Sequence, residues 1–129
     1  MIAKQPASLW AGKRVVELGC GCGLVGLTAA AAGSEVVLTD LVLAMAQRNL
    51  DVNFAPAEAA AAADSLPSAP ERSRNDEVRS RVRLQQLQWD SSTDLAAVQA
   101  GRPDFDVILG TDLLYSQETW TQLAQVRTH

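Results

Sequence analysis

A short apolar segment runs directly into a glycine-rich loop, and this junction constrains the fold more than any other feature. Residues 14–18 read Arg-Val-Val-Glu-Leu, and Gly19-Cys20-Gly21-Cys22-Gly23 follow at once. Apolar runs of this length are typical of buried β-strands. The glycines allow a sharp turn and let a ligand approach the backbone without a Cβ in the way. Residues 24–32 are rich in Ala and Leu, so they predict a helix that ends at Gly33.

The alternation of strand and helix continues along the chain. We expect further strands at 35–39, 82–88 and 105–110, and helices at about 42–53, 95–100 and from Ser116 onward. Apolar strands that alternate with helices predict a parallel sheet covered on both faces, so the expected fold class is α/β. At 129 residues the chain has room for one domain, over residues 1–129. Residues 55–77 are rich in Ala, Pro, Ser and charge without an apolar period, which predicts a flexible insertion.

Composition and charge argue against several classes of function. The formal net charge of -4 disfavours non-specific binding to nucleic acid or to an anionic membrane. Cys20 and Cys22 lie too close together in a tight loop for good disulfide geometry. The only histidine is His129, so we expect no metal site. Without a disulfide framework the chain fits a reducing compartment, and we expect the cytoplasm, with the nucleus as the alternative.

Useful polar and aromatic residues follow the carboxyl end of each predicted strand, where ligands bind in open parallel sheets. They are Glu17 with the glycine loop, Asp40, Trp89 with Asp90, and Asp112. Asp40 could accept hydrogen bonds from both hydroxyls of a ribose, and Trp89 with Asp90 could receive an adenine. The helix N-terminus after the loop offers unpaired N–H groups to a carboxylate or phosphate. These residues predict a site for a nucleoside with an anionic or zwitterionic tail.

Two cofactors fit this description. Gly21-x-Gly23-x-x-Gly26 matches the dinucleotide pattern, and Asp40 follows at a plausible distance. Glu17, however, lies two residues before Gly19, where its charge would repel a pyrophosphate but attract a cationic amino group. S-adenosylmethionine is therefore the favoured cofactor, and an NAD(P)-dependent oxidoreductase is the less favoured alternative.

Several segments resemble the seven-β-strand methyltransferases of the lysine-methyltransferase type, known as methyltransferase family 16. The similar segments are LWAGKRVVELGCGCGLVGLTAAAAG, VVLTDL, the paired Asn49 and Asn53, LQW, and FDVILGTDLLYSQET. The most specific of them is Asp112-Leu113-Leu114-Tyr115, which is similar to the Asp-x-x-Tyr motif beside the family's substrate lysine channel. Within the family, the chain looks most like the enzymes that methylate lysines of chaperones and AAA ATPases.

The resemblance implies a Rossmann-like, S-adenosylmethionine-dependent methyltransferase that transfers a methyl group to a lysine of a protein partner. It implies that Asp112 and Tyr115 position the acceptor amine. Together with the loop argument, it places the following residues at the cofactor: Glu17, Gly19, Cys20, Gly21, Gly23, Asp40, Trp89 and Thr111. Simpler roles stay open, because Asp40 could cap the second helix and Trp89 and Tyr115 could pack in the core.

The family fold has seven strands, and only the first four are expected here, in the order 3-2-1-4. This order leaves the strand at 105–110 at an open edge of the sheet. We therefore expect a truncated domain, and the alternative to an active enzyme is a catalytically incomplete fragment that binds cofactor or a partner.

Overall fold

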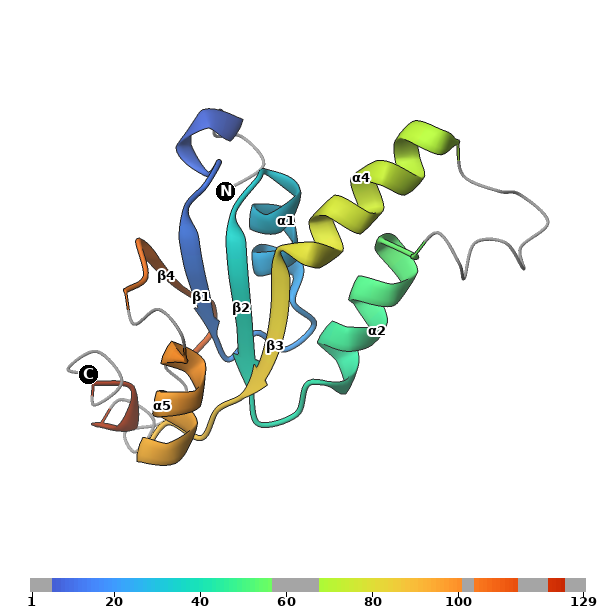
Figure 1. Cartoon of the computed structure of the whole chain (residues 1–129). Helices are drawn as coiled ribbons and strands as arrows, with labels where there is room; N and C mark the ends of the chain where they lie inside the picture. The colour runs from blue at the N-terminus through green and yellow to red at the C-terminus, as the bar shows by residue number, and fades with distance from the viewer. Residues whose placement is uncertain (1–5, 57–67, 101–103, 114–120, 125–129) are drawn as a thin grey trace.

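Four parallel strands form the centre of the fold. The computed structural model describes residues 6–56, 68–100, 104–113 and 121–124. The strands are β1 (Arg14–Leu18), β2 (Glu35–Asp40), β3 (Val82–Gln86) and β4 (Val107–Gly110). They lie in the order β3-β2-β1-β4, so β1 pairs with β2 on one side and β4 on the other (Figure 1). The expected α/β class and strand order are confirmed.

Helices cover both faces of this sheet. Four of them follow or precede strands, namely α1 (Leu24–Ala31), α2 (Ala44–Asn53), α4 (Ala69–Ser80) and α5 (Ser92–Gln99), and a 3-10 helix, η2 (Ala7–Leu9), precedes β1. Successive side chains of a strand point to opposite faces. One buried cluster joins Val15, Val36 and Leu38 to α1, α2 and α4, and the other joins Val16, Leu18 and Val37 to α5. The two central strands therefore carry apolar residues that point to both faces, because both of their faces are covered.

Helix α4 corrects the expectation of a flexible insertion at 55–77. Residues 57–67 lie outside the described part of the chain, but Ala69–Ser80 is helical. The N–H and hydroxyl of Ser68 both donate to the Glu71 carboxylate, at 2.8 and 2.7 Å, as in a capping box. Pro70 occupies the first turn, where a helix has no need of its missing N–H. Pro70 therefore helps to start this helix, although the proline content of residues 55–77 was one reason to expect a flexible insertion.

The same helix is docked by few but specific contacts. Val78 is its buried residue, which explains why no apolar period marks the segment. Arg79 forms an ion pair with Asp51 of α2 at 2.9 Å and also donates to the carbonyls of Leu50 and Phe54. Polar contacts with the end of α2 thus hold α4 in place. An apolar face, which a sequence pattern would detect, is largely missing from this helix.

The remaining differences concern the ends of elements. Helix α5 begins at Ser92 instead of residue 95, because the Ser91 hydroxyl accepts a hydrogen bond from the N–H of Asp94. Strand β4 begins at Val107 instead of residue 105, after Asp106, whose carboxylate accepts from the N–H of Arg14 at 2.8 Å. The carboxyl end of β4 lies at Gly110, as expected, whereas β3 ends at Gln86, two residues before the expected end, and β2 ends at Asp40, one residue beyond it.

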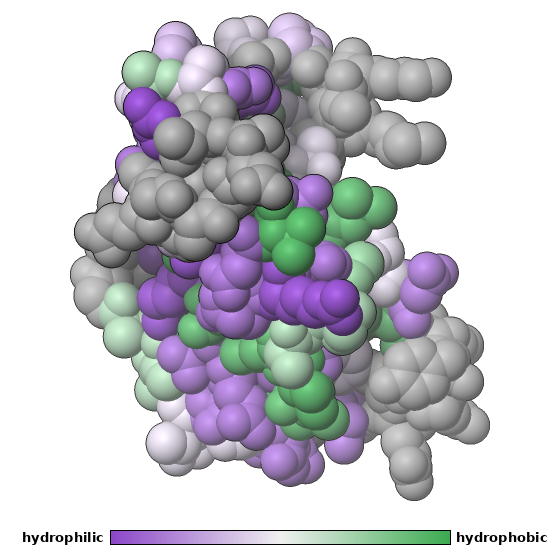
Figure 2. Space-filling model, turned by 90° about the vertical axis from the view of Figure 1, so that its right-hand side faces the viewer, coloured by the Kyte–Doolittle hydropathy of each residue, from purple (hydrophilic) through white to green (hydrophobic). Residues whose placement is uncertain are grey.

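The surface on the side of α2 and α4 is mixed, with hydrophobic atoms set among hydrophilic ones (Figure 2). Met45 and Val52 are the exposed apolar side chains of α2, and Leu41 and Val42 precede it. Within the described residues, the chain has no helix of the length and apolar character that crossing a membrane requires.

Candidate cofactor-binding site

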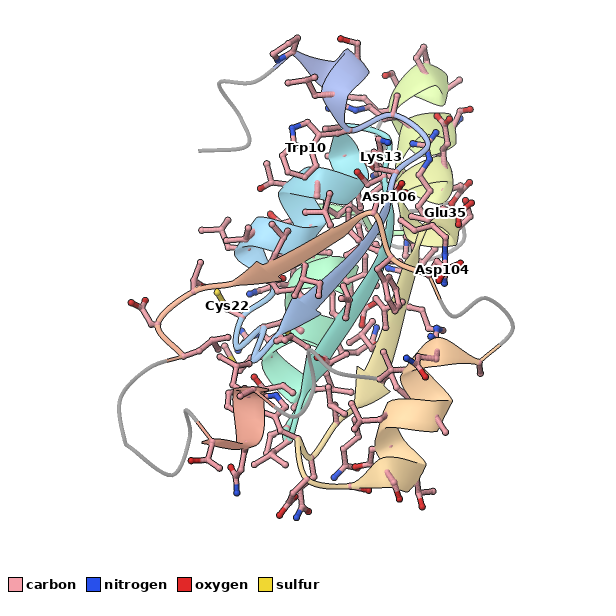
Figure 3. The ribbon with its side chains drawn as sticks, turned by 90° about the vertical axis from the view of Figure 1, so that its left-hand side faces the viewer. Trp10, Lys13, Cys22, Glu35, Asp104 and Asp106 are labelled. Carbon is pink, nitrogen blue, oxygen red and sulfur yellow. The ribbon has the colours of Figure 1, made fainter. Side chains whose placement is uncertain are left out.

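A cavity of about 440 Å³ lies at the carboxyl ends of the strands. Its volume falls in the range of pockets that hold small molecules and cofactors. Figure 3 shows the side chain of Cys22, which borders the cavity, at the opposite end of the sheet from Lys13 and Asp106. The wall is built from segments that follow the strands, together with Gln122: Gly19, Cys20, Gly21, Cys22, Asp40, Leu41, Leu87, Gln88, Trp89, Thr111, Asp112 and Leu113.

The glycine loop turns sharply between β1 and α1. Gly19, Gly21 and Gly23 have φ angles of 59°, 53° and 76°, a region that residues with a Cβ seldom adopt. A Cβ on Gly19 would lie 2.6 Å from Cδ2 of Leu113, so glycine is required for close contact between this loop and the segment after β4. The loop is tied to β2 where the N–H of Cys20 donates to the carbonyl of Thr39 at 2.8 Å.

Asp40 holds the loop from the end of β2. Its Oδ2 accepts from the N–H of Gly21 at 2.8 Å, and its Oδ1 accepts from Leu41 and Val42 at 2.7 and 3.3 Å. Helix α2 has Leu43 as its N-cap, so Asp40 does not cap that helix. A carboxylate has about four acceptor positions, and three N–H groups occupy three of them, so Asp40 retains capacity for about one further donor from the cavity that it borders.

Glu17 lies behind the loop, not in the cavity wall. Its side chain is 1% exposed, and its Oε2 accepts from the N–H of Gly26 at 2.8 Å. Gly26 is the third residue of α1, so Glu17 of β1 satisfies one of the helix's orphan donors. The structure therefore separates Glu17 from the place at the cofactor's amino group that the sequence suggested. Gly23 also lies outside the wall, as the N-cap of α1.

The burial of Glu17 has an electrostatic consequence. Burial raises the pKa of Glu17 above its ordinary value, and the negative charge of Asp40 adds to this shift. The hydrogen bond from Gly26 opposes the shift, because it favours the charged form. This buried acid belongs to the support of the loop.

The third and fourth strands contribute an aromatic wall and a rim. Trp89 is half-buried, so it packs against the cluster around α5 and also presents surface to the cavity. Thr111 and Asp112 are exposed at the rim, and Asp112 has a left-handed φ of 55°. Asp90 lies outside the wall and accepts from Nε2 of Gln88 at 2.8 Å. Tyr115 lies outside the described residues.

The two cysteines differ in environment. Both are free, with Cys20 buried and Cys22 exposed. Burial and the nearby charges of Glu17 and Asp40 raise the pKa of Cys20 to about 12, so it stays a neutral thiol. Among the described residues, no group of three or more His, Cys, Asp or Glu side chains is placed to hold a metal ion.

Sequence reasoning missed several residues of the wall and one of its supports. Leu41, Leu87, Gln88, Leu113 and Gln122 border the cavity. The first four lie inside the family-like segments, but they were not singled out as site residues, and Gln122 lies outside those segments. Asn49 was given no role from the sequence, yet its Nδ2 donates to the carbonyl of Cys22 at 2.9 Å. A bond between residues so far apart in sequence leaves no local pattern.

A larger hollow, of about 510 Å³, lies at the amino-terminal ends of the strands and contains three arginines. Arg14 donates to the carbonyl of Asp104 and stacks on Phe105, with its Cζ 4.7 Å from the ring centre. Arg81 pairs with Glu77, and Arg83 donates to the carbonyls at the end of α5. These guanidinium groups hold elements together, so the cavity at the carboxyl ends is the better candidate.

Comparison with known proteins gives a family match and several similar proteins. A family model described as lysine methyltransferase matches residues 2–129. A protein N-lysine methyltransferase METTL21A from Danio rerio is 33% identical over 118 residues, which are 92% of this chain and 44% of that protein. The same-named protein from Mus musculus is 30% identical over 120 residues, 92% of this chain and 44% of that protein. EEF1A lysine methyltransferase 3 from Mus musculus is 28% identical over 120 residues, 92% of this chain and 40% of that protein. The chain thus spans less than half the length of these relatives.

Proposed function

The chain belongs to the lysine methyltransferase family, and on that premise we propose that it binds S-adenosylmethionine in the cavity at the carboxyl ends of its strands. We further propose that the protein acts as a methyltransferase on a lysine side chain of another protein. The observation that carries the proposal is the convergence of the glycine loop, Asp40, Trp89 and Asp112 on one cavity.

The chemistry of the wall fits a nucleoside that carries a charged tail. Gly21 has open space where a Cβ would stand, so the loop backbone is accessible from the cavity. Asp40 offers carboxylate oxygens to ribose hydroxyls, and the half-buried ring of Trp89 offers an apolar face to an adenine. No arginine or lysine stands among the described wall residues, so this part of the wall provides no side-chain cation for a pyrophosphate. These features favour S-adenosylmethionine over a dinucleotide.

S-adenosylmethionine supplies a methyl group on a sulfonium centre that a neutral amine can accept. The protein's part is to align the acceptor and keep water out, and Leu41, Leu87 and Leu113 give the cavity apolar surface for this. Asp112 at the rim would attract an incoming lysine ammonium by charge, and the apolar wall would favour loss of its proton. Tyr115 stays a proposed second positioning residue.

Calorimetric titration with S-adenosylhomocysteine tests the cofactor. We expect saturable binding of S-adenosylhomocysteine by the chain and no binding of NAD under the same conditions. Asp40→Asn should weaken binding, because an amide replaces one acceptor oxygen and leaves a donor facing the backbone N–H groups. Binding of NAD in preference to S-adenosylhomocysteine would overturn the assignment in favour of an oxidoreductase.

Transfer needs a separate test, because a chain of less than half its relatives' length can bind cofactor without turnover. Incubation of the chain with S-adenosylmethionine carrying a labelled methyl group and a cell extract should label proteins on lysine. Binding without transfer would support the alternative, a catalytically incomplete cofactor-binding fragment. We also propose a reducing compartment, the cytoplasm or the nucleus, in which the free Cys20 and Cys22 would persist.

A further inference from the structure

Two side chains, one at the end of β2 and the other on α2, hold neighbouring residues of the glycine loop. Asp40 accepts from the N–H of Gly21, and Asn49 donates from its Nδ2 to the carbonyl of Cys22 at 2.9 Å. We propose that Asn49 is a positioning residue, which fixes the glycine loop in its cofactor-binding conformation from the side opposite to the cofactor. This inference rests on the proposed cofactor site.

Asn49 reaches the loop from behind. It is absent from the wall of the candidate cofactor cavity. Instead it borders a separate hollow of about 380 Å³ between α1 and α2, and Cys22 borders both spaces. The Cys22 backbone therefore forms part of a thin partition, with the cofactor cavity on one face and the Asn49 amide on the other. Asn49 can influence cofactor binding only through that backbone.

The loop needs such support because of its composition. Gly19, Gly21 and Gly23 all have left-handed φ angles, and glycine loses more backbone freedom than any other residue when it is held in one conformation. A loop that is already fixed in the free protein has less freedom to lose when a ligand binds, and binding is correspondingly tighter. Asp40 fixes the N–H of Gly21, in the peptide unit between Cys20 and Gly21, and Asn49 fixes the carbonyl of Cys22, in the peptide unit between Cys22 and Gly23. Together they hold the two peptide units on either side of the Gly21–Cys22 bond.

Asn53 provides a matched control on the same helix. It has the same side chain, lies one turn later in α2 and borders the same hollow. Its Nδ2 donates at 2.8 Å to the carbonyl of Asn49, a bond inside its own helix that leaves the loop untouched. Substitution of Asn53 therefore reproduces the effect on the helix and the hollow without the effect on the loop.

The test compares Asn49→Ala, Asn49→Asp and Asn53→Ala in the full chain. Calorimetry with S-adenosylhomocysteine should show affinity about three- to tenfold weaker for both Asn49 variants, the range expected for the loss of one hydrogen bond. Asn53→Ala should stay within about twofold of the wild type. Asn49→Asp keeps the size of the side chain, replaces the donor with an acceptor oxygen and adds a negative charge, so it serves as a second disruption of the bond if Asn49→Ala folds poorly.

Amide hydrogen exchange of the ligand-free chain is a second measurement. The exchange rates of the loop would stay unchanged if Asn49 had only a general structural role. The amides of Gly21 and Gly23 should exchange faster in the Asn49 variants, while those of β1 and β2 keep their wild-type rates. Wild-type affinity in the Asn49 variants, or an equal loss in Asn53→Ala, would overturn the inference. If the wild type binds no S-adenosylhomocysteine, the proposed function fails. Independently of that result, unchanged amide exchange of the loop in Asn49→Asp would refute the positioning role of Asn49.

Discussion

Gly26→Ala should destabilise the fold, although alanine normally strengthens a helix. Gly26 lies inside α1, where alanine is favoured over glycine by about 1 kcal/mol. A Cβ there would stand 2.2 Å from Cδ2 of Leu38, 2.6 Å from Oε2 of Glu17 and 3.1 Å from Cγ1 of Val36. These three side chains are 0%, 1% and 1% exposed, so they have little room to move away. Helix propensity and packing therefore predict effects of opposite sign at this position.

The contacts indicate which effect is larger. Forcing an extra methyl group into a packed core costs about 1–3 kcal/mol. Displacing Glu17 from the N–H of Gly26 removes a hydrogen bond from a buried carboxylate, which costs about 1–3 kcal/mol more. After subtraction of about 1 kcal/mol for helix propensity, we expect a net loss of about 1–5 kcal/mol in the free energy of unfolding.

Urea unfolding followed by circular dichroism measures this loss. Gly21→Ala is the control for backbone strain alone, because a Cβ at Gly21 meets no atom within 4 Å but its φ is 53°. It should lose about 1–2 kcal/mol. Shortening Leu38 to alanine removes the closest clash, so the losses from Gly26→Ala and Leu38→Ala should sum to more than that of the double variant, by at least about 0.5 kcal/mol. A Gly26→Ala chain as stable as the wild type, or additive losses in this cycle, would refute the packing argument.

Three further predictions concern titration, reactivity and transfer. Because burial raises the pKa of Glu17 above 4.5, the folded chain binds more protons than the unfolded chain from about pH 4 upward, and Glu17 contributes less stability as the pH rises through this window. Glu17→Gln should therefore gain stability relative to the wild type as the pH rises above about 4 in parallel unfolding experiments; a difference that stays constant with pH would contradict it. At neutral pH iodoacetamide should label the exposed Cys22 well before Cys20, whose pKa is about 12, and peptide mass spectrometry would reveal equal labelling if burial did not protect Cys20. Asp112→Ala should abolish methyl transfer and leave the affinity for S-adenosylhomocysteine nearly unchanged; lost binding in calorimetry would instead place Asp112 in the cofactor site.

The central strands could be predicted from sequence because they are buried on both faces. Residues 14–18 formed a strand with the expected bounds, and the strand from Glu35 ran one residue further than expected. Helix α4 was missed because it buries mainly Val78 and so lacks an apolar period. A signal was present, however. Ser68 is followed three residues later by Glu71, the spacing of a capping box, and Pro70 between them suits a first turn.

The residues of the candidate site could also be predicted only in part. Gly19, Gly21, Asp40, Trp89, Thr111 and Asp112 could be placed from their positions after strands, because strand ends converge at one edge of a parallel sheet. Glu17 occupies a comparable sequence position, yet its side chain is turned away from the cavity. Side chains alternate along a strand, so Glu17 shares a face with Val15, and that face lies under α1. Its charge suggested a ligand contact, but the alternation of the strand already argued against one.

Binding and transfer depend on different parts of the chain. The contacts that shape the glycine loop come from Glu17, Asp40 and Asn49, all within the first half of the sequence. The residues proposed to meet the acceptor, Asp112 and Tyr115, follow β4, which lies at an edge of the described sheet. Substitutions behind the loop should therefore lower cofactor affinity first, whereas substitutions after β4 should lower transfer at saturating cofactor. A loop variant that kept full affinity but lost transfer would break this division, because it would show that the loop positions the acceptor as well as the cofactor.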